Sequence, residues 1–283
     1  MAIEWPLVLF SLLAGAGGCM FAYVGLSEFT GVTKEQRFKL TITALVITIV
    51  GGFCSVAHLA APQNVMAAVW NLGSFSGISV ELMLIGVACI VMFAYLVVLK
   101  RGANDTALKV LGALGIVAGL ALGFFTGHGY VIEAQAAWNT EVLPFAYLGT
   151  SLAMGAFAYL VAAVAFKADA ADVEKVGVPV CVGALIGALT SIAYVVAVGF
   201  DHAAEAGIVL WGGIIVCGVV ITAICGVLAA LKKNIGGAYG VPVVGLLATL
   251  VGGLALRCFM WVMGGGFLSL FAVASTSRVV FFG

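Results

Sequence analysis

Four ionisable side chains stand near the ends of long apolar runs of the sequence: His58, Glu81, His128 and Arg257. Because a helix rises about 1.5 Å per residue, all four are expected at one depth, near one boundary of a membrane-spanning bundle. Ionisable side chains at such a depth are costly and mark functional sites. A His, a carboxylate and an Arg among aromatic residues suit a quinone, whose carbonyls need donors and whose reduced hydroxyls need proton acceptors. These four residues are therefore our candidate quinol-binding residues.

Each of the four also has a structural interpretation that the sequence leaves open. His128 follows Gly127 at the end of an apolar run and fits an ordinary interfacial residue. Arg257 fits a side chain that extends to the lipid headgroups. His58 and Glu81 fit a purely structural pair, and spacing alone does not separate a quinol site from a polar cluster in a transporter.

The elements that must position these residues are membrane-spanning helices. Of the 283 residues, 64% are hydrophobic and only 8% are charged, whereas soluble domains have about 25% charged residues. We predict an all-α integral membrane protein, a bundle of eight transmembrane helices that forms a single transmembrane domain over residues 1–283. The apolar runs, each near the ~20 residues that cross a bilayer, are 6–27, 40–58, 79–99, 108–127, 145–166, 178–199, 207–231 and 241–262. The first run has no basic segment before it, so we expect a retained span rather than a cleaved signal.

Basic residues predict the orientation, because short loops rich in Lys and Arg stay in the cytoplasm. Ten of the twelve basic residues fall on one side, in or beside the odd-to-even connections: Lys34, Arg37, Lys39, Lys100, Arg101, Lys109, Lys167, Lys175, Lys232 and Lys233. Both termini and the other three connections are then extracytoplasmic, in a multi-pass membrane protein. All five tryptophans fall at the outer end in this topology: Trp5, Trp70, Trp138, Trp211 and Trp261.

Metal cofactors are not expected in this chain. The seven cysteines lie in or beside the spans without a C-x-x-C pair, which favours packing residues over iron–sulfur or zinc ligands. A haem b site needs two axial His from facing helices, and only His58 and His128 end spans on one side, with His202 in an outer connection. We expect no haem, no iron–sulfur cluster and no metal site. The expected surroundings are membrane lipid, and no nucleic-acid partner is expected.

The connection from Val56 to Glu81, "VAHLAAPQNVMAAVWNLGSFSGISVE", is unusual for a loop because it contains no Lys, Arg or Asp. Irregular backbone at a membrane surface needs cover from protein or ligand. We predict a short helix after Pro62 that lies beneath a docked partner subunit, with His58 and Glu81 at the two ends of a lid over the quinol pocket.

Three motifs carry a family resemblance: "EWPLVLFSLL" at residues 4–13, the "HLAAPQNVMAAVWNLGSFSGISVE" segment, and "LRCFMWVMGG" at residues 256–265. Together with eight spans, they resemble the membrane anchor subunit of dimethyl sulfoxide reductase, the DmsC type. The family pattern begins with W-P-L and continues with H-L-G-x-P and a small-residue stretch that ends in an acid. This chain has Ala60 where the pattern has Gly, and the motif-level likeness is confined to the first ninety residues.

The resemblance implies a function and partners. In the family, the anchor binds menaquinol and passes its electrons to an iron–sulfur electron-transfer subunit, which relays them to a molybdopterin catalytic subunit on the extracytoplasmic side, in anaerobic respiration. By this resemblance His58 and Glu81 are the quinol pair, and Arg257 is carried over as a third member. The anchor is itself a non-catalytic, quinol-oxidising subunit, and the terminal substrate is chosen elsewhere.

Two other interpretations remain open from the sequence. An eight-span small-solute transporter fits the 38 glycines, which let helices pack closely, and "SVAHLAA" and "VGFDHAA" at the ends of spans 2 and 6 hint at a repeat. Transporters place polar sites near the membrane midplane, however, which disfavours this alternative. An assembly factor without a redox role predicts that the outer polar residues tolerate substitution.

Overall fold

The computed structural model describes residues 3–30, 36–58, 70, 73, 76–102, 105–135, 137–204, 206–233 and 239–279. These residues form the helices α1 (Trp5–Thr30), α2 (Arg37–His58), α4 (Gly77–Lys100), α5 (Asp105–His128), α6 (Val142–Ala165), α7 (Ala170–Lys175), α8 (Gly177–Val198), α9 (Phe200–Ala204), η3 (Val209–Ile221), α10 (Thr222–Ala230) and α11 (Gly240–Val279). No strand occurs in this described part of the chain. The predicted all-α fold class is confirmed.

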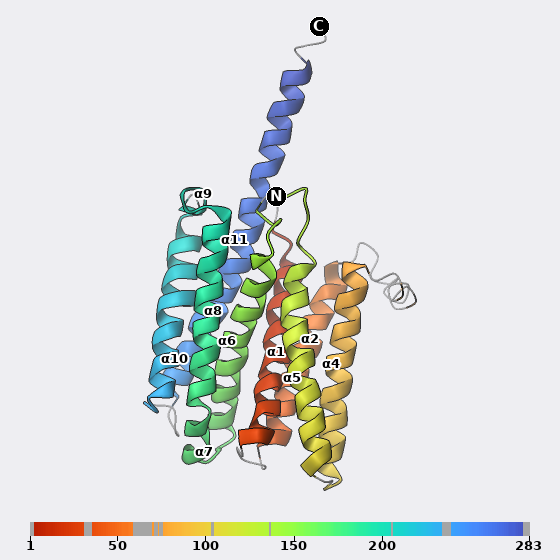
Figure 1. The fold of residues 1–283 in the computed structure, drawn as a ribbon, viewed down its shortest axis with the longest axis vertical. Helices are drawn as coiled ribbons and strands as arrows, with labels where there is room; N and C mark the ends of the chain where they lie inside the picture. Colours follow the sequence, from red (N-terminus) through yellow and green to blue (C-terminus); the bar gives the residue numbers. More distant parts are fainter. Residues whose placement is uncertain are drawn as a thin grey trace.

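Eight helical segments within the described residues are long and apolar enough to cross a membrane. The seventh of them combines η3, a π-helical stretch, with α10. The segments stand side by side as a bundle, with both ends of the chain at one end of it and α7 at the other (Figure 1). The last helix, α11, runs beyond the bundle toward the C-terminus, so its spanning part, Gly240–Gly264, is shorter than the helix.

The two ends of the bundle differ in their side chains. The end that holds α7, called the basic end, carries the described basic residues of the odd-to-even connections: Arg37, Lys39, Lys100, Arg101, Lys109, Lys167, Lys175, Lys232 and Lys233. The opposite end, called the aromatic end, carries Trp5, Trp138, Trp211 and Trp261. The predicted separation of charge and tryptophan is therefore visible in the fold, and the assignment of the aromatic end to the outside stays a prediction.

Helix α1 lies at the centre of the bundle, where it packs against α2, α5 and α6. Glycines make this close packing possible, as is common between membrane helices. A Cβ on Gly119 of α5 would overlap the carbonyl group of Gly18 of α1, and one on Gly155 of α6 would overlap the α1 backbone at Met20. The small-residue stretch of α1 is thus buried, although it reads in the sequence as an ordinary apolar span.

A buried ion pair at the basic end joins three helices. Glu28 of α1 accepts hydrogen bonds from Arg37 of α2 and from the hydroxyl of Tyr95 of α4, and both charged side chains are almost fully buried. The predicted second span, 40–58, starts after Arg37, whereas α2 begins at Arg37 and its guanidinium turns inward to the carboxylate.

The predicted short helix after Pro62 lies outside the described residues.

Candidate functional site

Glu81 lies in the second turn of α4, at the aromatic end. The hydroxyl of Ser76 caps this helix by accepting a hydrogen bond from the backbone N–H of Ser79, at 3.3 Å, which fixes where the helix begins. The Glu81 carboxylate then rests against Gly129, just after α5: a Cβ built on Gly129 would lie 3.1 Å from Oε1 of Glu81. A glycine at this position therefore leaves room for the carboxylate.

A pocket of about 320 Å³ opens beside this contact, and its lining is Gly77, Val80, Phe125, His128 and Gly129. The volume falls in the range of small-molecule sites, roughly 300–1,000 Å³. The lining combines aromatic and aliphatic surface with an imidazole, and the carboxylate of Glu81 lies at its edge. The pocket therefore combines apolar surface with polar groups at its rim.

His128 is the last residue of α5 and is exposed. Its imidazole contacts two rings of the same helix, with centroid distances of 6.0 Å to Phe124 and 5.7 Å to Phe125. His128 thus lines the pocket, and Glu81 lies beside the lining residue Gly129. An exposed ring at a helix end also agrees with an interfacial residue, so its contact with quinol stays a prediction.

His58 is the last residue of α2, which packs against α4. The placement of its side chain lies outside what the structure describes, as does that of the His202 side chain. The predicted pairing of His58 with Glu81 is therefore untested.

Arg257 is completely buried between α1, α6 and α11. Its guanidinium makes five hydrogen bonds: Nε donates to Ser11 Oγ at 3.0 Å, NH1 to Thr150 Oγ1 at 3.3 Å and to the Gly253 carbonyl at 3.0 Å, and NH2 to the Ser11 carbonyl at 3.1 Å and to Ser151 Oγ at 3.5 Å. The alternative that Arg257 extends to the lipid headgroups is wrong. Within the described part of the chain, no carboxylate bonds to it, so hydroxyl and carbonyl dipoles solvate this charge.

Arg257 does not line the pocket, but aromatic rings connect the two. The guanidinium carbon lies 4.5 Å from the centroid of the Tyr147 ring, close enough for a cation–π contact. Tyr147 in turn lies 5.8 Å, centroid to centroid, from Tyr130, which directly follows Gly129. The positive charge of Arg257 therefore lies behind the pocket, separated from it by the rings of Tyr147 and Tyr130.

The sequence of the whole chain matches a known protein family. The sequence profile of the DMSO reductase anchor subunit (DmsC) family matches residues 1–283, the whole chain. The chain belongs to the DmsC family. No curated protein matches it. As a DmsC-family protein it is a multi-pass membrane protein and the anchor subunit of a DMSO reductase type complex, associated with catalytic and electron-transfer subunits. The transporter interpretation is therefore set aside.

The aromatic end of this DmsC-family chain holds a cluster that sequence analysis missed. Trp138 and Trp261 pack edge to face at 5.0 Å between centroids, and Tyr130 contacts both rings. Trp138 also donates from Nε1 to the Met260 carbonyl at 2.7 Å, which ties the connection after α5 to α11. Aromatic residues are common at membrane boundaries, so the sequence offered no signal that these three rings form one unit with Tyr147.

Tyr130 is the member of this cluster nearest to the pocket. Burial raises the pKa of its phenol well above the usual value, and the neighbouring Tyr147 and Glu81 raise the pKa further. The group is therefore a neutral phenol throughout the physiological pH range, able to donate a hydrogen bond but not to accept a proton.

Metal ligation finds no support among the described residues, where no group of three or more His, Cys, Asp or Glu is placed to hold an ion. Three of the cysteines, Cys19, Cys225 and Cys258, are buried and free, and the other four are partly buried. Such sites suit packing residues. The expected lack of haem and of iron–sulfur ligands stays a prediction.

Proposed function

We propose that this anchor subunit oxidises menaquinol, or a related quinol, in the Glu81 pocket, and that the electrons leave to an iron–sulfur subunit and then to a molybdopterin catalytic subunit. The observation that carries the proposal is the pocket at the aromatic end, which His128 and Phe125 line and beside which the Glu81 carboxylate lies against Gly129. Family membership supports the association with electron-transfer and catalytic subunits.

Quinol oxidation needs two proton acceptors, because each quinol that becomes a quinone releases two protons and two electrons. The Glu81 carboxylate accepts one proton at the pocket edge. By its match to the family motif, His58 at the end of α2 accepts the other. His128, exposed at the pocket rim, passes protons between the pocket and water.

Arg257 assists without touching the quinol. A proton that leaves a quinol hydroxyl leaves negative charge behind it, and the guanidinium behind Tyr147 stabilises that charge through a water-poor region. The uncharged phenol of Tyr130 stands between them as a donor.

The orientation follows from the basic residues. If the basic end lies in the cytoplasm, the pocket faces the extracytoplasmic side of the bacterial inner membrane, and the protons are released there. A catalytic subunit on the same side then uses the electrons without moving net charge across the bilayer. The complex contributes to anaerobic respiration through turnover of the quinol pool, and its terminal substrate is set by the catalytic subunit.

Substitution of Glu81 by Gln tests the proposal, because the amide keeps the size of the side chain but cannot accept a proton. General base catalysis contributes about 10²–10⁴-fold, so quinol-dependent reduction of the partner cluster in membranes should fall at least about 100-fold. Reduction of the same complex by a small artificial donor should be unchanged. Glu133→Gln, in the exposed connection at the same end, is the matched control. Full quinol-dependent turnover in Glu81→Gln would overturn the assignment.

A further inference from the structure

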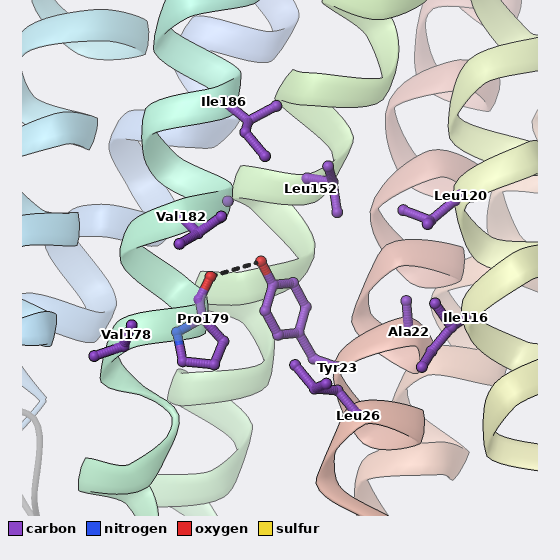
Figure 2. Close-up of a pocket in the computed structure, with 11 residues that line it drawn as sticks. Ala22, Tyr23, Leu26, Ile116, Leu120, Leu152, Val178, Pro179, Val182 and Ile186 are labelled. Atoms are coloured by element: carbon purple, nitrogen blue, oxygen red, sulfur yellow. Dashed lines mark hydrogen bonds between the residues drawn. The ribbon is translucent and has the colours of Figure 1, made fainter. Parts of the chain in front are cut away.

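An apolar groove in the half of the bundle nearest the basic end lies far from the quinol pocket. Its volume is about 400 Å³, and its floor is formed by α1 and α6 between α5 and α8. Figure 2 shows the side chains that border it: Val178, Val182 and Ile186 on α8, Ile116 and Leu120 on α5, and Tyr23 on the floor.

The chemistry of the lining suits a hydrocarbon chain. Tyr23 carries the one polar side chain of the groove, and its hydroxyl already donates to the Pro179 carbonyl at 3.3 Å (Figure 2). A quinol headgroup would find neither a proton acceptor nor an aromatic pair there. The groove therefore offers apolar surface alone.

The length of the groove matches one leaflet. Val178 and Ile186 are eight residues apart on α8, which is about 12 Å along the helix. Half of a bilayer core about 30 Å thick is about 15 Å deep. Val178 stands at the start of α8, close to the membrane surface at the basic end, so the groove runs from that surface toward the midplane.

A cation stands at the mouth of the groove. Lys109 lies seven residues before Ile116 on α5, so the two share one face of the helix, with the Lys about 10 Å nearer the membrane surface. Lys109 is exposed. Asp105 lies one turn before Lys109 on α5. On the other side of the mouth, the ammonium of Lys175 is already paired with the carboxylate of Asp172 at 2.6 Å. Lys109 is therefore placed to meet a phosphate at headgroup depth.

We infer that this groove, which the quinol site does not use, binds one acyl chain of an anionic phospholipid, whose phosphate pairs with Lys109. The bound lipid fills the space between α5 and α8, which contact α1 and α6 from opposite sides. It is a structural ligand of the anchor and takes no part in electron transfer.

The test measures phospholipid retained by the purified, intact complex after detergent washing, by native mass spectrometry. Val182→Trp fills the groove and should lower retention about tenfold, the factor that about two buried CH₂ groups supply. Leu189→Trp, two turns along the same face of α8 and outside the groove, is the matched control and should retain lipid. Lys109→Gln should lower the preference for anionic over zwitterionic phospholipid about fivefold, as one surface charge near an anionic lipid predicts. Lys100→Gln, an exposed cation on α4, should leave that preference unchanged.

A second measurement holds even if the Trp variant does not assemble. A phosphatidylglycerol with a photoactivatable acyl chain, added to the wild-type complex, should label residues of the groove on α5 and α8 more than Leu189. Equal retention in the two Trp variants, or labelling without preference for the groove, would overturn the inference. Recovery of a quinol or detergent in place of phospholipid would overturn the inference as well. It would not affect the proposal that quinol is oxidised in the Glu81 pocket.

Discussion

Replacement of Arg257 by Met separates the stability role of this buried charge from its functional role. Two of the hydroxyl acceptors of the guanidinium have other partners: Ser11 Oγ donates to the Val8 carbonyl at 3.2 Å, and Thr150 Oγ1 donates to the Ala146 carbonyl at 2.9 Å. Loss of the guanidinium therefore leaves these hydroxyls bonded within their own helices. Met fills most of the space with a flexible apolar chain.

Two opposing effects set the magnitude for the Met variant. Hydrogen bonds to a charged group contribute about 1.5–3 kcal/mol each, but removal of a buried charge in favour of apolar volume is often neutral or stabilising by about 1–4 kcal/mol. We expect the free energy of unfolding to change by no more than about 2 kcal/mol. Arg257→Lys should cost more, about 3–5 kcal/mol, because an ammonium keeps the buried charge yet cannot reproduce the planar fork that reaches both α1 and α6.

The effect of Arg257→Met on turnover should be larger than its effect on stability suggests. The guanidinium stands two ring separations behind the pocket, on the order of 10 Å, where a unit charge at an effective dielectric constant of about 20 contributes about 1–2 kcal/mol. Quinol-dependent turnover in Arg257→Met should therefore fall about tenfold, with artificial-donor turnover unchanged. Val262→Met, at a lipid-exposed position of α11, is the control. The reasoning is refuted if the Met variant unfolds more easily than the Lys variant, or if it keeps full quinol-dependent turnover.

Three further predictions concern packing and access to the pocket. Glu28→Gln should lower the free energy of unfolding by about 3–5 kcal/mol, because it leaves Arg37 buried without its carboxylate. The double variant Glu28→Leu/Arg37→Met should recover most of this loss in a denaturant titration. A double variant that loses as much stability as Glu28→Gln, or more, would contradict this. Gly119→Leu should prevent assembly of the complex, since its side chain meets α1 backbone, whereas Gly86→Leu faces open space and should assemble normally; equal yields of both in membranes would count against the packing argument. Gly129→Val should raise the KM for quinol about tenfold or more by displacing the pocket-edge carboxylate, and an unchanged KM would place the quinol elsewhere.

The positions of the spans could be predicted from the sequence because length and apolarity decide them. The run predicted at 145–166 corresponds to the span Val142–Ala165, and the run at 241–262 to Gly240–Gly264. Differences are confined to helix ends, where a few residues such as Arg37 extend a helix into what looks like a loop. That residue illustrates the limit: its basic side chain is typical of a cytoplasmic connection, and only the facing Glu28 explains its burial.

The candidate site was only partly predictable from the sequence. Sequence placed Glu81, His128 and Arg257 at one depth; Glu81 and His128 lie beside the pocket at the aromatic end, whereas the Arg257 guanidinium bonds to Thr150 and Ser151 inside α6. Sequence could not tell that Arg257 turns inward, because that depends on Ser11 and Ser151 from helices far away in the chain. Nor could it reveal the contact of Glu81 with Gly129, which arises from packing of α4 against α5.

The location of the quinol is the central claim, and photolabelling tests it most directly. A photoactivatable naphthoquinol analogue, bound to the wild-type complex in membranes and competed with excess quinol, should label peptides that cover residues 76–81 and 125–130. The same labelling should be lost in Glu81→Gln and kept in Glu133→Gln. Competable labels confined to other helices, or labelling that is unchanged in Glu81→Gln, would contradict a quinol site at the junction of α4 and α5.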